Sequence, residues 1–346
     1  MRLFIWAPDI FPGDAVGNHC FGVARVARRL GYEVSLHAQH HAGDLASIDT
    51  LCDAMTGDDT LWLSYSIHDP LLERLLALPG KKLCYFHGVT SPEMLREFEP
   101  VTADLCAKSI EQFPQLAGFD LLLANSRFTA SSLPPQIPPE RVRILPPVSA
   151  DMAVFRHTSP RRADRSADAP FVLLVVGRVV PHKRIEDAID IVAGVRERGV
   201  DARLQVIGTA PNGQYAGFLV ERATSLGVAP FVEFAGMVDD ANLFDRFDRA
   251  DALLVVSRHE GFCVPVLEAM HLGLPTFVRD GTAASEVGAD ASVVFQTLPQ
   301  AVEAIATMAA NPVLATCAVA AGRQRAVALL DETRDEVFRA ILGAAR

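Results

Sequence analysis

The sequence predicts an α/β protein made of two doubly wound, Rossmann-like domains, each with a mainly parallel sheet. Short apolar segments alternate with amphipathic helical patterns along the whole chain, which is typical of strand–helix units joined by right-handed crossovers. Several of these segments are apolar throughout, as expected for strands that helices cover on both faces. The length of 346 residues accommodates two domains of ordinary size.

The expected strands form two sets, one on each side of a polar segment. In the first half they are Leu3–Ala7, Val34–Ala38, Leu61–Tyr65, Leu83–His87, Leu121–Ala124 and Val142–Leu145. In the second half they are Phe171–Val176, Leu204–Ile207, Val232–Phe234, Leu253–Val256, Thr276–Val278 and Val293–Phe295. Between them lie helical patterns such as Ile185–Arg198, in which the apolar residues share one face.

Residues 156–170 (RHTSPRRADRSADAP) interrupt this pattern. They show no apolar periodicity and are rich in Arg and Pro, which indicates a linker. We therefore expect an N-terminal domain over residues 1–155 and a C-terminal domain over residues 171–330, followed by a helix over residues 331–346. Doubly wound sheets bind ligands at the carboxyl ends of their strands. Two such domains facing each other across a cleft favour a nucleotide-type ligand.

Composition excludes several classes of protein. Hydrophobic residues make up 50% of the chain, so it can build cores and is not disordered. The formal net charge of -10 argues against a nucleic-acid partner, because such binding depends on cations that neutralise phosphates. The cysteines form no CxxC pair, which speaks against a zinc site or a disulfide framework and fits a reducing cytosol. No run of about 18 apolar residues is present, and the N-terminus is expected to be a strand, not a signal peptide.

The stretch Ser257–Asp290 (SRHEGFCVPVLEAMHLGLPTFVRDGTAASEVGAD) has the most specific pattern in the chain. Glu260 lies in the loop just beyond a predicted strand, and a helix that contains Glu268 is expected over Val264–Leu272. The N-terminus of this helix, near Phe262–Val264, would stabilise a pyrophosphate through its free N–H groups and its dipole. The two carboxylates could then reach sugar hydroxyls at two points of one ligand.

The stretch Val175–Arg184 (VVGRVVPHKR) is a second candidate for ligand binding. A buried strand is expected to end at Val176, Gly177 allows a tight turn, and Arg178 and Lys183 follow before the next helix. Arginine presents a planar fork of donors and lysine a mobile point charge, so the pair suits an anionic group. The two cations could neutralise a departing diphosphate without a metal ion.

Together these stretches resemble the retaining glycosyltransferases of the GT-B fold, in the large GT4 family that includes sucrose synthases and bacterial mannosyltransferases. The donor domain of that family carries Gly-Arg followed by Lys, and Glu-x7-Glu in an E-G-F-G-x-P-x-x-E-A-M setting. Glu260 and Glu268 have this spacing. Cys263 replaces the usual small Gly, a departure that bears on the shape of the sugar pocket. The matching context residues are Gly261, Phe262, Pro265, Ala269 and Met270.

The resemblance implies roles for these residues. Glu260 would bind hydroxyls of the donor sugar, Glu268 the ribose hydroxyls, and Arg178 with Lys183 the diphosphate. Glu286, in SEVG, matches a later acidic position of the family. The resemblance also implies that residues 331–346 pack back on the N-terminal domain. The donor-binding set is Gly17, Arg178, Lys183, Gly261, Phe262, Cys263, Val264 and Glu268, and the catalytic set is His87, Glu260, Arg178 and Lys183.

The N-terminal half resembles the family at two further places. Gly13–Asn18 (GDAVGN) is similar to the family's glycine-rich loop, which approaches the donor phosphate, and it precedes a helix expected over Val23–Leu30. Gly17 would make that approach, although the segment lacks the GxGxxG dinucleotide pattern. His87, in CYFHGVT at the end of a predicted strand, occupies the place of the family's active-site His.

The same residues also allow ordinary structural interpretations. The two carboxylates could be a loop residue and an exposed helix charge, and the two cations a solvated basic turn. His87 could be a satisfied structural residue, Gly17 a turn residue, Asn125–Arg127 a helix cap with a surface charge, and Glu286 a structural carboxylate. The other histidines lack the spacing of metal ligands, so we expect no metal site.

The sequence thus predicts a cytosolic, retaining hexosyltransferase that needs no cofactor and no metal. Its partners would be a nucleoside-diphosphate sugar, bound mainly by the C-terminal domain, and a saccharide or lipid-linked acceptor. No Asp-x-Asp occurs, consistent with cations in the place of a divalent ion. SRHEGFCVP resembles bacterial polysaccharide mannosyl- and rhamnosyl-type transferases, which favours GDP-mannose over UDP-sugars. The base would contact Gly208–Gly213 and Gly236–Val238.

Several alternatives stay open at this point. A GT-B epimerase would release nucleoside diphosphate without an acceptor, and a phosphorylase would need orthophosphate. An inactive paralogue that binds the donor is the rival outside the enzymes, and it would typically lose Glu260, Lys183 or His87, all of which are present. Weak peripheral contact with the inner face of a membrane also stays open, because acceptors of such enzymes are often lipid-linked.

Overall fold

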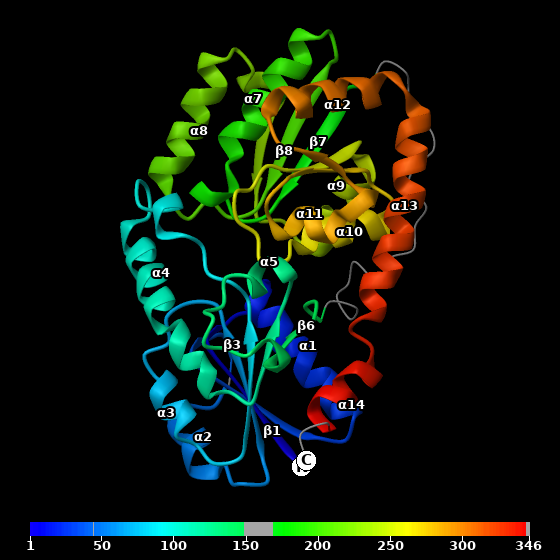
Figure 1. The fold of residues 1–346 in the computed structure, drawn as a ribbon. Coiled ribbons are helices and arrows are strands. Elements are labelled where there is room, and N and C mark those ends of the chain that lie inside the picture. Colours follow the sequence, from blue (N-terminus) through cyan, green and yellow to red (C-terminus); the bar gives the residue numbers. More distant parts are fainter. Residues whose placement is uncertain (44, 149–168, 344–346) are drawn as a thin grey trace. The chain divides into compact units, whose positions relative to one another are not determined.

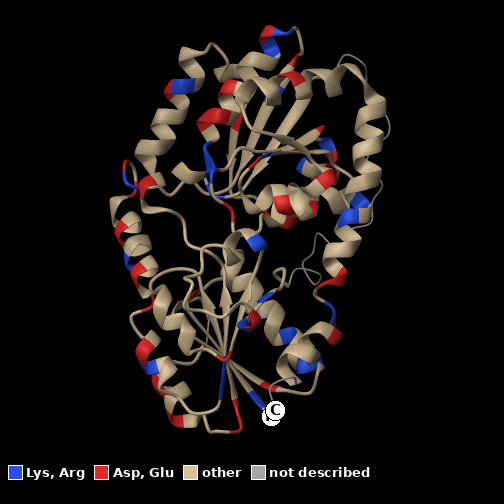
Figure 2. Cartoon of the chain, in the orientation of Figure 1, with Lys and Arg blue, Asp and Glu red and all other residues tan. Residues whose placement is uncertain are grey.

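The computed structural model describes residues 1–43, 45–148 and 169–343, which divide into two compact units (Figure 1). Unit 1 comprises the described parts of Met1–Pro92, Val101–Asp151 and Leu330–Arg346, and unit 2 those of Glu93–Pro100 and Met152–Leu329. Each unit is built on a six-stranded sheet in which all paired strands are parallel. Figure 2 shows Lys and Arg interspersed with Asp and Glu along the helices of both units.

The sheet of unit 1 has the order β2-β1-β3-β4-β5-β6. Its strands are β1 (Arg2–Ile10), β2 (Glu33–His41), β3 (Thr60–Tyr65), β4 (Lys81–Phe86), β5 (Leu121–Ala124) and β6 (Val142–Ile144). In β1, Leu3 and Ile5 enter one buried cluster while Phe4 and Trp6 enter another on the opposite face. Both faces of the strand are therefore apolar, which explains the continuous hydrophobic run in the sequence.

The helices of unit 1 cover both faces of this sheet. They are α1 (Ala15–Arg29), α2 (Ile48–Ala54), α3 (Leu72–Leu76), α4 (Pro100–Gln112), α5 (Arg127–Ala130) and α14 (Asp335–Gly343), with the short helices η1 (Pro92–Met94), η2 (Phe113–Gly118) and η3 (Pro139–Arg141). The C-terminal α14 lies beside α1 (Figure 1). Arg29 and Asp335 form an ion pair of 2.8 Å, and Phe338 is fully buried in the cluster that contains β1 residues.

The sheet of unit 2 has the order β12-β11-β10-β7-β8-β9. Its strands are β7 (Phe171–Val176), β8 (Ala202–Ile207), β9 (Val232–Gly236), β10 (Ala252–Val255), β11 (Thr276–Arg279) and β12 (Val293–Phe295). Its helices are η4 (Pro181–Lys183), α7 (Ile185–Glu197), α8 (Gly213–Ser225), η5 (Ala229–Phe231), α9 (Asp240–Arg249), α10 (Val264–Leu272), α11 (Ala283–Gly288), η6 (Ala289–Ala291), α12 (Leu298–Ala310) and α13 (Pro312–Asp331). The order reverses between β7 and β10, so their carboxyl ends meet at the switch point of the sheet, where such folds bind ligands.

Unit 2 also includes Glu93–Pro100, a short segment from the N-terminal half of the chain. The ring of Phe98 packs against Tyr215 and Phe218 of α8, at centroid distances of 5.1 and 5.8 Å. The side-chain amide of Asn212 donates a hydrogen bond to the carbonyl of Phe98. No pattern in the sequence indicated this contact.

Every strand expected from the sequence is present, with small shifts at the ends. The helix expected over Val23–Leu30 is wrong in its start, because α1 begins at Ala15. Asp14 caps it by accepting hydrogen bonds from the backbone N–H groups of Val16 and Gly17. Gly17 therefore lies in the first helical turn and not in a loop. The expected linker, residues 156–170, lies almost entirely outside the described residues, and the cleft between the two domains stays a prediction.

One helical stretch, Pro312–Gly343, would be long and apolar enough to cross a membrane by length and composition alone. In the structure it consists of α13 and α14, and 17% of its most apolar window is buried. Arg325 of α13 donates hydrogen bonds to the carbonyls of Glu286 and Val287, while α14 buries Phe338 in unit 1.

Candidate functional site

The two sequence stretches singled out above meet at the switch point of unit 2. The loop after β7 carries Gly177, Arg178 and Lys183, and the loop after β10 carries Glu260. The two loops touch directly, because the backbone N–H of Arg258 donates to the carbonyl of His182 at 2.9 Å. A pocket at this place is lined by Val175, Val176, Gly177, Arg178, Lys183, Ile185, Leu254, Val255, Val256, Ser257, Glu260 and Cys263.

An ion pair between Lys183 and Glu260 is the centre of this site. The Lys183 Nζ lies 2.6 Å from Glu260 Oε1, and the Ser257 hydroxyl donates to the same oxygen at 2.7 Å. The side chains of Lys183 and Glu260 are only 21% and 8% exposed. Such a pair is held by charge-assisted hydrogen bonds in a partly dry environment, where removing one partner is costly.

The pair shifts the pKa of both partners. Burial by itself would raise the pKa of Glu260, but the charge of Lys183 and the two hydrogen bonds outweigh it and lower the pKa below its usual value. Burial would likewise lower the pKa of Lys183, but Glu260 outweighs it and raises that pKa. The lysine is thus held as a cation and the glutamate as an anion at neutral pH.

Arg178 is the second cation of the site. It is exposed at the end of β7, and its guanidinium forms no ion pair with any described residue. A guanidinium without a protein partner can take two oxygens of an anionic group at once. Gly177 adopts a φ of +142°, a backbone conformation that residues with a Cβ rarely adopt, while a Cβ there would make only an ordinary contact of 3.8 Å with the Lys183 side chain.

The N-terminus of α10 lies in the loop that carries Glu260. The helix runs from Val264 to Leu272, as the sequence predicted, and no side chain caps its first turn. Phe262 and Cys263 are 5% and 7% exposed, so a ligand would meet the backbone N–H groups here instead of these side chains. Cys263 has a φ of 75°, which is the left-handed conformation that glycine adopts without strain. That conformation gives a physical reason for the glycine usual at this position of the family.

Glu268 lies in the second turn of α10, as expected. Its residue surface is 5% exposed, and its carboxylate makes no hydrogen bond or ion pair with the residues that the structure describes. Burial raises its pKa to about 7, and the charge of Asp240 contributes to the rise. A buried carboxylate with spare acceptors is suited to a ligand that brings hydroxyl donors.

The segments expected to contact the base lie side by side at the ends of β8 and β9. The N–H of Gly208 donates to the carbonyl of Gly236 at 2.9 Å. Gly208 has a φ of +145°, and a Cβ at this position would lie 2.0 Å from the carbonyl oxygen of Gly177. Only glycine allows the chains leaving β7 and β8 to approach so closely. Glu286 lies on α11 and is half-buried, with its carbonyl bonded to Arg325.

His87 lies in unit 1, at the end of β4. Its backbone N–H donates to Tyr65, and its carbonyl accepts from the amide of Asn125. Burial lowers its pKa to about 3, so the imidazole is neutral under ordinary conditions. Its Nε2 is buried and has no hydrogen-bond partner among the described residues. Ser126 caps α5 with a capping box, so the structural interpretation of Asn125–Arg127 holds for the serine.

Gly17, the other N-terminal candidate, packs tightly against the chain that leaves β1. A Cβ there would lie 2.0 Å from the carbonyl oxygen of Phe11. Glycine is therefore required for the first turn of α1 to approach this chain. Within residues 1–43, 45–148 and 169–343, no group of three or more His, Cys, Asp or Glu could hold a metal ion.

Sequence reasoning missed several residues that contact the candidate residues within each unit. Ser257 lies three positions before Glu260 and could have been found as a local partner. His19 of α1 stacks on Tyr85 and lies edge-on to His87, with ring centroids 3.8 and 5.4 Å away. Arg279 contacts the loop of Glu260 from the neighbouring strand. Neither His19 nor Arg279 belongs to a pattern that can be recognised without the fold.

Comparison with known proteins matches this site to a family. Residues 158–325, which include both ligand loops and α10, match the family model of glycosyl transferases group 1. The C-terminal half is therefore similar to the group 1 glycosyl transferases. The retaining mechanism and the sugar are not part of this finding.

Similar proteins include two bacterial enzymes. A GDP-mannose-dependent alpha-(1-6)-phosphatidylinositol dimannoside mannosyltransferase of Mycobacterium tuberculosis is 29% identical over 172 residues, which are 48% of this chain and 43% of the relative. A D-inositol 3-phosphate glycosyltransferase of Actinosynnema mirum is 33% identical over 187 residues, which are 48% of this chain and 45% of the relative. The matches thus span less than half the length of these relatives.

The likeness in fold extends beyond residues 158–325. The solved structure of HepE from Anabaena, in complex with UDP and glucose, is similar with a TM-score of 0.77 over 100% of both chains, at 15% identity. At this identity the likeness concerns the fold alone. The two parallel six-stranded sheets are those of the GT-B glycosyltransferases, as the sequence predicted.

Proposed function

We propose that the chain transfers a hexose from a nucleoside-diphosphate sugar to an acceptor hydroxyl, with retention of configuration and without a metal ion. One observation carries the proposal: the Lys183–Glu260 pair, with Arg178 beside it, lies at the switch point of unit 2, next to an uncapped helix N-terminus. Cations and free N–H groups gathered around one pocket suit a diphosphate leaving group.

The donor-binding roles follow from the chemistry of each residue. Arg178 and Lys183 take the diphosphate, and the backbone N–H groups of Cys263 and Val264 add to the same anionic site. Glu260, held ionised by Lys183, accepts hydrogen bonds from hydroxyls of the sugar. Glu268 accepts hydrogen bonds from the ribose hydroxyls. Those hydroxyls would supply the donors that the buried carboxylate lacks, and so favour its ionised form.

Catalysis in this proposal is mainly electrostatic. As the bond between the anomeric carbon and the diphosphate lengthens, negative charge grows on the phosphate oxygens, and Lys183 and Arg178 stabilise it. The acceptor hydroxyl attacks from the same face, and a departing phosphate oxygen takes its proton. His87, being neutral with a pKa of about 3, positions the sugar or acceptor through hydrogen bonds and does not act as a strong base.

GDP-mannose is the proposed donor. It is supported by the printed activity of the Mycobacterium tuberculosis relative. UDP-sugars are the second candidate, supported by the UDP and glucose bound to the HepE structure of the same fold. The proposed acceptor is a saccharide or a lipid-linked saccharide, in glycan synthesis on the cytoplasmic side of a membrane. The phosphatidylinositol dimannoside named for the first relative supports a lipid-linked acceptor.

A binding and turnover screen in EDTA tests the proposal. GDP-, UDP- and ADP-sugars are compared by thermal shift. Hydrolysis or transfer is measured as the amount of nucleoside diphosphate released. We expect GDP-mannose to give the largest shift in melting temperature and to transfer with the α-anomer retained, as read by NMR of the product. Stabilisation by no sugar nucleotide would refute the donor site, and an absolute need for a divalent ion would refute the role of the cations.

Two variants separate the carboxylate roles. Glu268→Ala is expected to weaken nucleotide binding more than Glu260→Ala, which should mainly lower turnover. Equal loss of binding in both would contradict the assignment. Release of nucleoside diphosphate without any acceptor would favour an epimerase, and strict dependence on orthophosphate a phosphorylase.

A further inference from the structure

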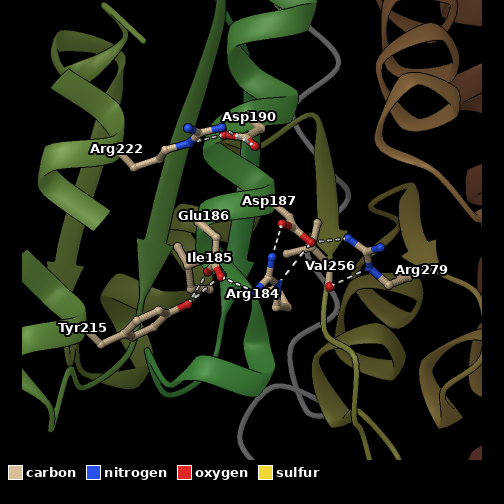
Figure 3. Close-up of polar contacts among 9 residues, drawn as sticks. All are labelled: Arg184, Ile185, Glu186, Asp187, Asp190, Tyr215, Arg222, Val256 and Arg279. Atoms are coloured by element: carbon tan, nitrogen blue, oxygen red, sulfur yellow. Dashed lines mark hydrogen bonds and ion pairs between the residues drawn. The ribbon is translucent and has the colours of Figure 1, made fainter. Parts of the chain in front are cut away.

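An ionic network at the start of α7 adjoins the two ligand loops (Figure 3). At its centre is Asp187, in the first turn of α7, whose side chain is 7% exposed. Its carboxylate binds two guanidinium groups, with Arg184 Nη2 at 2.9 Å and Arg279 Nη2 at 2.5 Å. One carboxylate thus joins the residue that follows Lys183 to a residue of β11.

Arg279 connects this carboxylate to the second ligand loop. Its Nε donates to the carbonyl of Val256 at 2.8 Å, and Val256 is followed directly by Ser257, which bonds Glu260. Figure 3 shows the side chain of Arg279 reaching Asp187 with one nitrogen and Val256 with another. A planar fork with two donors can make both contacts at once. Arg279 therefore couples the start of α7 to the loop that carries Glu260.

Arg184 connects the same carboxylate to the first ligand loop. Its backbone is left-handed, with φ 55° and ψ 45°, a conformation that residues with a Cβ rarely adopt. Its guanidinium is fixed by Asp187 and by Glu186, at 2.7 Å from the latter, and Glu186 in turn accepts a hydrogen bond from Tyr215 at 2.5 Å. An unfavourable backbone held by several contacts next to a functional residue is a sign that its geometry matters.

We propose that Arg279, Asp187 and Arg184 are positioning residues that hold Lys183 on Glu260 in the geometry needed for transfer. The expected change in kcat rests on the proposed function, whereas the expected change in the contact between Lys183 and Glu260 does not. Without the coupling, each loop could still form, since β7 and β10 pair directly. The fixed distance between the Lys183 ammonium and the Glu260 carboxylate would be lost.

The chain offers a matched control on the same helix. Asp190, one turn after Asp187, forms a two-pronged ion pair with Arg222 of α8 at 2.7 and 2.8 Å. Figure 3 shows this pair on the side of α7 that faces α8. It ties two helices together with the same groups but touches neither ligand loop. Removing it tests the loss of an arginine–carboxylate pair as such.

The kinetic test compares Arg279→Gln, Arg279→Lys and Asp187→Asn with Arg222→Gln. With the sugar nucleotide that the wild type turns over, we expect kcat to fall by about 10- to 100-fold in the first three variants, because small errors in position cost about this much. The donor KM should change by less than about threefold, since the diphosphate charge grows in the transition state. Arg279→Lys should fail to rescue, because its single nitrogen cannot occupy the two positions from which Nε and Nη2 of Arg279 donate. Arg222→Gln should retain the wild-type kcat.

A second readout needs no substrate. Titration of glutamate carboxyl carbons by NMR, with Glu260→Gln to assign the signal, follows Glu260 directly. We expect the pKa of Glu260 to rise in Arg279→Gln and Asp187→Asn, because burial raises it once Lys183 no longer lies at the carboxylate. In Arg222→Gln it should stay at the wild-type value. If the wild type turns over no sugar nucleotide, the proposed function fails and this titration decides the inference alone.

Three results would overturn the inference. One is an unchanged Glu260 titration in Arg279→Gln. Another is an equal loss of kcat in Arg222→Gln, which would make the effect one of general stability. The third is full activity of Arg279→Lys, which would show that charge, and not the bridge between Asp187 and Val256, is what counts. Should Arg279→Gln not fold, Arg279→Lys and Asp187→Asn carry the same comparison.

Discussion

Replacing Glu268 by glutamine is expected to stabilise the folded chain above neutral pH while it weakens nucleotide binding. The carboxyl is 5% exposed, and burial raises its pKa from 4.5 to about 7. Between these two values the folded chain keeps a proton that the unfolded chain releases. The free energy of unfolding therefore falls as the pH rises through this window. Glutamine is neutral throughout and has no such dependence.

The size of this change in stability follows from the difference between the two pKa values. A difference of one pKa unit corresponds to about 1.4 kcal/mol, so the rise from 4.5 to about 7 destabilises the ionised folded state by about 3 kcal/mol. Glu268→Gln removes this cost. The variant should be more stable than the wild type by about 3 kcal/mol at about pH 8, and close to equal at about pH 4.5. Bound nucleotide should narrow the difference at high pH, because ribose hydroxyls favour the carboxylate over the amide.

Urea denaturation at about pH 4.5, 6 and 8 measures this difference for wild type and Glu268→Gln. Glu221→Gln, on an exposed part of α8, controls for the loss of one negative charge. A difference in unfolding free energy that does not vary with pH would refute the reasoning, since the cost would then not come from ionisation. A variant that is less stable at about pH 8 would refute it as well.

Three further predictions concern the neighbouring residues. Lys183→Met should destabilise the fold by about 3–5 kcal/mol near pH 7. The loss of stability should be smaller in acid, because Glu260 has a lowered pKa and the stabilisation from its ionised form disappears as the pH falls through that value. Equal losses of unfolding free energy at both pH values, measured by urea denaturation, would contradict this. His87, with a pKa of about 3, should show no change in its imidazole NMR signals between about pH 5 and 8, and a titration there would overturn its neutral role. Cys263→Gly should be more stable than Cys263→Ala by about 0.5–1 kcal/mol, because relief of the left-handed backbone strain exceeds the entropy that a glycine loses on folding. Thermal denaturation of the two variants measures this difference. The reverse order of stability would show that the strain is absent.

The strands and the sequence motifs could be predicted because their signals are local. β7 and β10 are continuous apolar runs, and their type follows from burial on both faces. Glu260 and Glu268 lie within one loop and the helix that follows it, so their spacing alone places them near one end of a strand. The start of α1 could not be placed, because the Asp14 cap competes with the turn propensity of the glycines around it.

Pairing between distant residues depended on the order of the strands. Lys183 and Glu260 are separated by 77 positions and Asp187 and Arg279 by 92, and no pattern in the chain relates them. They meet because β10 pairs with β7 on the side opposite β8 and β11 follows β10. Had β10 been placed at the edge of the sheet, the same motifs would lie apart.

The sequence by itself determined the α/β class, the strands and the two loops that carry the charged residues, because apolar runs and short motifs act over a few neighbouring positions. Only the tertiary structure decided which charges are buried together and what this does to them. The ionised state of Glu260, the raised pKa of Glu268 and the neutral state of His87 arise from desolvation and from charges brought close by folding. Such effects fall steeply with distance and depend on burial, and neither quantity can be read from positions along the chain.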